Sequence, residues 1–154
     1  MEENQLKILV ESVVNYFNVT RNDDVSVGTP YLLNVGQSEE TDFISGMIAI
    51  SGNKNGWLRY SAPRIMIKHL LLSMGEIDTS ADNMEDMVGE VANTISGNLR
   101  QHFGSDFLIS VPKVMSGASQ QNEEHKQTNG DISRCYVVPL YWKQYNSSIV
   151  IYLK

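Results

Sequence analysis

Apolar residues recur at the three-to-four-residue spacing of amphipathic helices in three segments of the chain. These segments are Gln5–Phe17, about Ser61–Gly75, and about Ala81–His102. The second has a serine and a proline at its start and a glycine at its end, which are typical boundary signals of helices. The pattern therefore predicts three helices, of which the last is the longest.

Six shorter runs are typical of strands, because apolar residues are concentrated in them between clusters of Gly, Ser, Asp and Asn. They are too short and too closely linked for parallel crossover connections. We expect one domain over residues 1–154 with an α+β fold, in which helices pack on a largely antiparallel sheet. Its two helix-plus-three-strand halves would be related by a pseudo-twofold, and Ser116–Gly130 would be a mobile surface loop. The predicted strands are Val25–Val35, Phe43–Ile50, Gly56–Tyr60, Phe107–Met115, Ile132–Trp142 and Ser147–Leu153.

The composition narrows the classes of function. The formal net charge is −6 and Lys and Arg do not cluster, whereas proteins that bind nucleic acids or anionic membranes draw affinity from clustered cations. No apolar run approaches the roughly 20 residues of a membrane span, and the acidic N-terminal segment differs from a signal peptide. The single cysteine, Cys135, fits a reducing compartment. We therefore expect a cytoplasmic protein that binds neither nucleic acid nor membrane.

The third predicted helix has an unusual outer face. At about 100° per residue, Asp86, Glu90, Asn93 and Gly97 form a narrow stripe opposite the apolar face. Glycine inside a helix costs about 1 kcal/mol relative to alanine, and asparagine also costs some tenths. Packing does not offset this cost, because both residues face outward. The apolar face is formed by Met84, Met87, Val88, Val91, Ile95 and Leu99.

This stripe has a functional interpretation and a neutral one. Gly97 would permit the close approach of another backbone, and the short amide of Asn93 offers a donor and an acceptor at one fixed place. The neutral interpretation is that the stripe is only a solvated helix face, because most helices have one and tolerate single Gly or Asn residues.

Other reactive residues give weaker signals. His69, His102 and His125 share no metal-ligand spacing, so no metal site is expected. Cys135 lies in a predicted strand and is expected to be a small buried side chain rather than a nucleophile. The sequence also contains no phosphate-binding glycine loop and no nucleophile elbow.

The segment Asp86–Asn98 resembles the signature helix of the CheX/CheC/FliY phosphatases. In that signature a Glu is followed three residues later by an Asn and, four residues after that, by a Gly, which Glu90, Asn93 and Gly97 match. The motif occurs once, as in CheX-type members, and Thr94 stands where many relatives carry Met.

The resemblance covers nearly the whole chain from about Val10. The first predicted helix is similar to the family's N-terminal helix, and Ile109–Gly117 looks like its strand after the motif helix. Val138–Leu140 resembles the segment that leads into the last hairpin.

This resemblance implies an auxiliary phosphatase that acts on the aspartyl phosphate of a CheY-like receiver domain of a response regulator. The receiver would hold Mg²⁺, so the chain would need no cofactor of its own. Asn93 would orient the attacking water and Glu90 would pair with a receiver lysine, while Asp86 and Gly97 would contact the partner. The resemblance also implies a homodimer. The alternative is a noncatalytic module that binds the phosphorylated receiver, or docks at the flagellar switch, through the same helix face.

Overall fold

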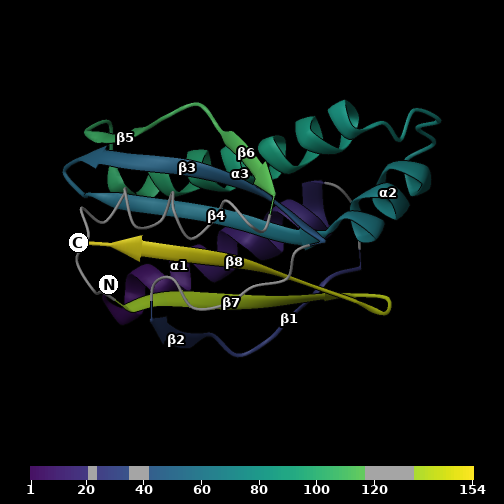
Figure 1. Ribbon diagram of the computed structural model, residues 1–154. Helices are drawn as coiled ribbons and strands as arrows, with labels where there is room; N and C mark the ends of the chain where they lie inside the picture. The colour runs from purple at the N-terminus through teal and green to yellow at the C-terminus, as the bar shows by residue number, and fades with distance from the viewer. Residues whose placement is uncertain (21–23, 35–41, 117–133) are drawn as a thin grey trace.

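An eight-stranded antiparallel sheet forms the centre of the protein in a computed structural model that describes residues 1–20, 24–34, 42–116 and 134–154 (Figure 1). Four strands follow one another in the order β7-β8-β4-β3. At one edge β1 and β2 both pair with β7, and at the other edge β5 and β6 both pair with β3. The strands are β1 Ser26–Val27, β2 Tyr31–Asn34, β3 Phe43–Gly52, β4 Gly56–Pro63, β5 Phe107–Ile109, β6 Lys113–Ser116, β7 Arg134–Trp142 and β8 Tyr145–Leu153.

This topology confirms the predicted α+β fold and its pseudo-twofold. The β3–β4 hairpin of the first half meets the β7–β8 hairpin of the second half at the β4–β8 pair. The short strands β1 and β2 of the first half pair with β7, and the short strands β5 and β6 of the second half pair with β3. Outward from the β4–β8 pair, each side of the sheet therefore has one long hairpin strand followed by two short strands from the other half.

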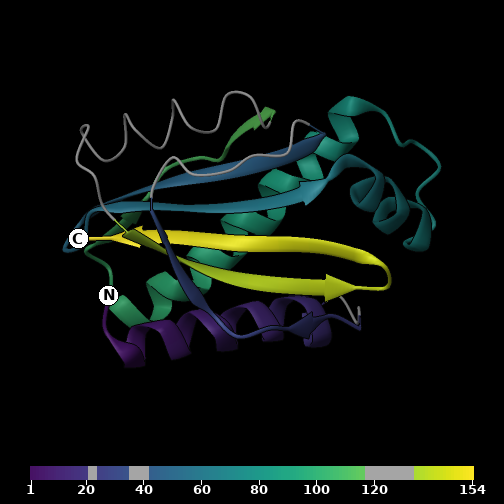
Figure 2. The same ribbon diagram turned by 60° about the horizontal axis from the view of Figure 1, so that its bottom comes forward.

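Helices α1 (Glu3–Val14) and α3 (Ala81–Phe103) lie together against one face of the sheet (Figures 1 and 2). A π-helical turn, η1 (Asn15–Thr20), continues the first helix and buries Tyr16 and Phe17. Helix α2 (Arg64–Ser73) lies beyond the end of β4. Helix α3 is the third predicted helix, and it forms at the expected place, one residue longer than predicted.

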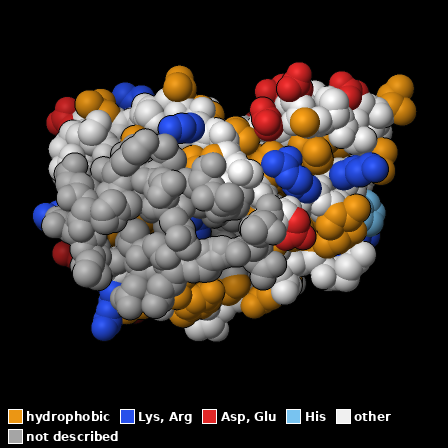
Figure 3. Space-filling view, viewed as in Figure 1, with side chains coloured by type: hydrophobic (Ala, Val, Ile, Leu, Met, Phe, Trp, Pro, Cys, Tyr) orange, Lys and Arg blue, Asp and Glu red, His pale blue; other side chains and the backbone are white. Residues whose placement is uncertain are grey.

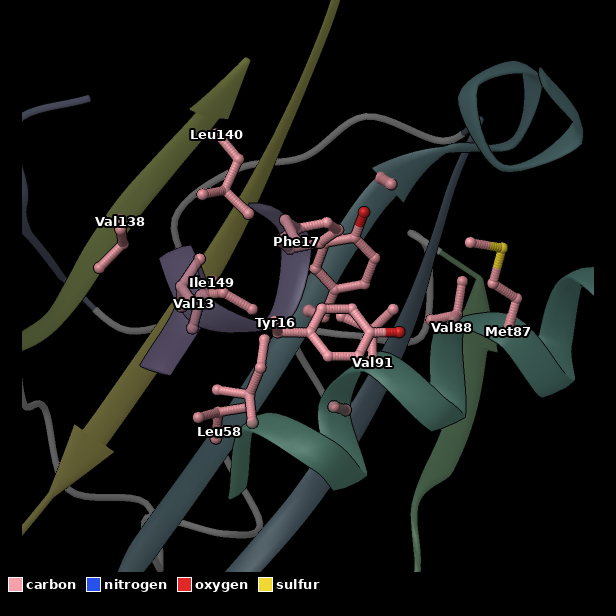
Figure 4. Packing of buried hydrophobic residues seen from close by; sticks show 14 of the residues in the cluster. Val13, Tyr16, Phe17, Leu58, Met87, Val88, Val91, Val138, Leu140 and Ile149 are labelled. Atoms are coloured by element: carbon pink, nitrogen blue, oxygen red, sulfur yellow. The ribbon is translucent and has the colours of Figure 1, made fainter. Parts of the chain in front are cut away.

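The core follows from the alternation of side chains along the strands. In β4, Leu58 and Tyr60 point toward the helices, whereas Trp57 belongs to a second apolar cluster with Met47. Figure 4 shows Val88 and Val91 pointing from α3 into the first cluster. The helix is thus fixed to the sheet by its apolar side.

Some predicted boundaries differ from the structure, and two predicted strands are divided. Helix α2 begins at Arg64 rather than near Ser61, because β3 stays paired with β4 up to the Phe43–Pro63 pair and Ser61 is part of that strand. The predicted strands Val25–Val35 and Phe107–Met115 are each interrupted, giving β1 and β2, and β5 and β6. His125 and nearly all of the predicted loop Ser116–Gly130 lie outside the described residues.

Gly46 in β3 lets α3 approach the sheet closely. A Cβ atom at this position would lie 2.9 Å from the Val88 backbone oxygen and 3.2 Å from its carbonyl carbon. Because the obstacle is backbone, Gly46→Ala is expected to displace α3 and to destabilise the fold by about 1–3 kcal/mol. Urea unfolding would measure this as a lower midpoint, and an unchanged midpoint would show that the helix does not depend on this contact.

Candidate functional site

Helix α3 has defined ends. At its start, the Ser80 hydroxyl accepts a hydrogen bond from the Asn83 amide (3.4 Å), and the Asn83 side chain donates to the Asp78 carbonyl oxygen (2.8 Å). At its end, Gly104 has a φ of 94° and its amide donates to the Arg100 carbonyl oxygen (2.9 Å). Serine caps and glycine at this position are common helix boundaries. These ends set the length of the helix, whereas the packing of its apolar side on the sheet sets the direction of its outer face.

The structure confirms the predicted faces of α3. Asp86, Glu90 and Asn93 are exposed, and Gly97 is half-buried. Met84 is half-buried, whereas the rest of the predicted apolar face is buried: Met87, Val88, Val91, Ile95 and Leu99.

A pocket of about 520 Å³ lies along the exposed face of α3. Three carboxylates, those of Glu85, Asp86 and Glu90, line it together with the Asn93 amide. Acidic side chains gather at the top of the view in Figure 3, over the end of α3 that is nearest α2. The opposite wall is apolar and comes from the segment after β5 and from β6. Its residues are Val111, Pro112 and Val114.

The pocket brings three of the four predicted site residues together. Asp86, Glu90 and Asn93 all line it, whereas Gly97 is not among its described lining residues. Gly97 lies one helical turn beyond Asn93, and a Cβ atom built there would meet nothing within 4 Å. No packing contact in the described part of the chain therefore requires glycine at this position.

Sequence reasoning missed five residues of the pocket. Glu85 and Gly89 belong to the same helix, and the other three form the apolar wall. One signal of that wall was available, because Pro112 lies inside a predicted strand and proline interrupts central strands. The local sequence does not show that this segment and α3 face each other across the pocket.

The chemistry of the pocket is that of positioning and charge. The Asn93 amide can donate and accept hydrogen bonds at once, and the carboxylates accept them or pair with cations. Among the described residues that line the pocket, there is no Ser, Thr, Cys, Lys or His, so the three carboxylates are its only ionisable side chains. The site can therefore orient a water molecule or a cationic partner group.

Cys135 is buried, as predicted. The residue is 2% exposed, and its thiol lies 3.3 Å from the Leu33 carbonyl oxygen, to which it donates. Burial raises the pKa of the Cys135 thiol, although the nearby Arg59 opposes this. Burial and the raised pKa both disfavour the thiolate, which is the nucleophilic form of cysteine.

The described residues contain neither a metal-binding cluster nor a membrane-spanning helix. No three His, Cys, Asp or Glu side chains in residues 1–20, 24–34, 42–116 and 134–154 are grouped so that they could hold a metal ion. Within the same ranges, no helix combines the length and the apolar composition needed to cross a membrane.

Several solved structures have the same fold. A CheC-like superfamily protein from Shewanella sp. PV-4 is 20% identical, with a TM-score of 0.76, over 100% of this chain and 99% of that chain. The chemotaxis protein CheX from Vibrio vulnificus is 18% identical, with a TM-score of 0.71, over 98% and 99%. A chain of a CheX–CheY–BeF3–Mg²⁺ complex from Borrelia burgdorferi is 17% identical, with a TM-score of 0.68, over 97% of both chains.

The sequence comparison gives the family. None of the curated proteins matches this chain. The family described as chemotaxis phosphatase CheX matches residues 44–134, which is more than half of the chain and includes all of α3 and both walls of the pocket. The chain belongs to the CheX family of chemotaxis phosphatases.

Proposed function

We propose that this protein removes the phosphoryl group from the aspartyl phosphate of a CheY-like receiver domain, and that Asn93 positions the attacking water. Membership of the CheX family supports a phosphatase. The CheX–CheY complex among the similar structures supports a receiver as the partner. The observation that carries the residue assignment is that Glu90 and Asn93 are both exposed, one turn apart, along one pocket.

The reaction needs few groups from this chain. The water oxygen forms a bond to phosphorus, the bond from phosphorus to the aspartyl oxygen breaks, and the proton of the water leaves with inorganic phosphate. Such transfers depend mainly on positioning and on charge stabilisation. The receiver would supply Mg²⁺ and a lysine, whereas Asn93 would hold the water in line with the leaving oxygen. Glu90 would pair with the receiver's lysine and fix the orientation of the two proteins.

Gly97 gives a test that separates folding from partner contact. Gly97→Ala is expected to leave the fold intact or to stabilise it by up to about 1 kcal/mol, because alanine favours helices and nothing described obstructs its Cβ. If the receiver backbone approaches this position, the added methyl group lowers kcat/KM about tenfold. Urea midpoints and phosphate-release kinetics of the same preparation would measure both effects. Unchanged kinetics would remove Gly97 from the interface.

The proposed function is tested by the lifetime of phosphoryl groups on a panel of receivers. Each receiver is phosphorylated with a small-molecule donor and followed with and without this protein. We expect a shorter lifetime for at least one receiver with the wild type, and much less shortening with the same low concentration of Asn93→Ala or Glu90→Ala. Binding to receivers without a shorter lifetime for any of them would instead support the noncatalytic module. Formation of a homodimer stays a prediction.

A further inference from the structure

The apolar wall of the pocket is formed by a β-bulge. Ile50 of β3 pairs with Ile109 of β5, but Met47 of β3 pairs with Lys113 of β6. Two residues of β3 therefore lie opposite three residues of the edge strand, 110–112. One extra residue on one strand defines a bulge, and bulges often re-aim side chains beside functional sites.

Ser110 fixes the geometry of this bulge. Its amide donates to the Ala49 carbonyl oxygen (3.0 Å), and its hydroxyl accepts a hydrogen bond from the Ala49 amide (2.9 Å). The same hydroxyl donates to the Val111 carbonyl oxygen (2.9 Å). The backbone amide and carbonyl groups of Ala49 are thus satisfied despite the interrupted ladder, and the backbone of Val111 is held by Ser110.

The bulge places Val111 at the pocket. Val111 is 83% exposed and lines the pocket together with Glu90 and Asn93. Gly89 of α3 lies beside Pro112, since a Cβ atom on the glycine would lie 3.5 Å from the proline ring, an ordinary van der Waals distance. The bulge therefore lies against the helix at Gly89 and Pro112. The bulge thus holds the aliphatic side chain of Val111 in water, across the pocket from the carboxylates.

We propose that Val111 is a specificity-determining contact for the phosphorylated receiver, and this rests on the proposed function. The pocket offers a negative wall, formed by Glu85, Asp86 and Glu90, to a partner site that contains a metal ion and a lysine. Val111 stands on the opposite wall and would meet an apolar side chain beside that cationic site. Binding then removes its aliphatic surface from water, which favours receivers with an apolar residue at that place.

The test is Val111→Ser, with Ile77→Ser as the matched control. Ile77 is a second strongly exposed aliphatic residue (93%), in the connection between α2 and α3, and it does not line the pocket. With a receiver that the wild type dephosphorylates, Val111→Ser is expected to raise KM about tenfold while kcat stays within about twofold. Ile77→Ser is expected to change neither value. An unchanged KM for Val111→Ser, or an equal rise for Ile77→Ser, would overturn the proposal.

A second measurement separates this proposal from the phosphatase activity. If the wild type shortens no phosphoryl lifetime, the proposed function fails, and the affinities for a receiver activated with beryllium fluoride decide about Val111. Weaker binding by Val111→Ser than by Ile77→Ser would keep Val111 as a docking contact. Equal binding by the two variants, or no binding by the wild type, would overturn that role too.

Discussion

Asn93→Ala is expected to slow dephosphorylation of the receiver about a hundredfold, which corresponds to about 2.7 kcal/mol in the activation barrier. Asn93 is exposed along the pocket and is proposed to hold the water, so its loss would act on the transition state rather than on the docked complex. We therefore expect kcat to fall while the affinity for the phosphorylated receiver changes little. Rapid-mixing measurements of phosphoryl loss at saturating concentrations of this protein would give kcat directly.

The matched control for this variant is Asn98→Ala. Asn98 belongs to the same helix but is not among the described residues of the pocket, and it lies instead near Glu11 and His102. Its replacement is expected to leave kcat unchanged. Full activity of Asn93→Ala would contradict the assigned role, and so would an equal loss in both variants, because that would indicate damage to the helix.

Glu90→Ala is expected to lower kcat/KM for the receiver about thirtyfold or more, equivalent to about 2 kcal/mol. The reason is the loss of the proposed ion pair, which would leave the receiver lysine without its partner in a site shielded from water. Affinity should account for most of this loss. The difference between wild type and variant should narrow as the salt concentration rises, because ions screen the charges.

Glu85→Ala tests whether this effect is specific. Glu85 lines the same pocket and carries the same charge, but it is not part of the predicted stripe. Its removal is expected to lower kcat/KM only about twofold, as for an exposed charge. Equal losses in the two variants would mean that the pocket attracts the receiver through net charge alone, and would contradict a specific pair at Glu90.

The helix that carries the site, α3, could be predicted from the sequence because its apolar periodicity is a local pattern. The apolar periodicity of residues 81–102 fixes which side of α3 faces the sheet, so it also fixes the exposure of Glu90 and Asn93. The costs of Asn93 and Gly97 in a helix set this face apart from an ordinary solvated one. Both inferences hold within a single element and do not depend on tertiary contacts.

The other wall of the pocket depends on contacts that the local pattern does not contain. The run Phe107–Met115 was predicted as one strand, and its division depends on the register against β3. The same holds for the start of α2, where pairing of β4 extends the strand beyond Ser61. In each case long-range strand pairing takes precedence over the local helix and turn signals.

The most direct test of the central claim is turnover. A phosphorylated receiver in large excess over this protein is followed until its phosphate is released. A catalyst positions a new water in every cycle, so we predict that a small amount of the wild type releases phosphate from all of the receiver, much faster than the receiver loses it alone. Release limited to one equivalent, or a longer phosphoryl lifetime, would contradict a phosphatase and show a module that only binds.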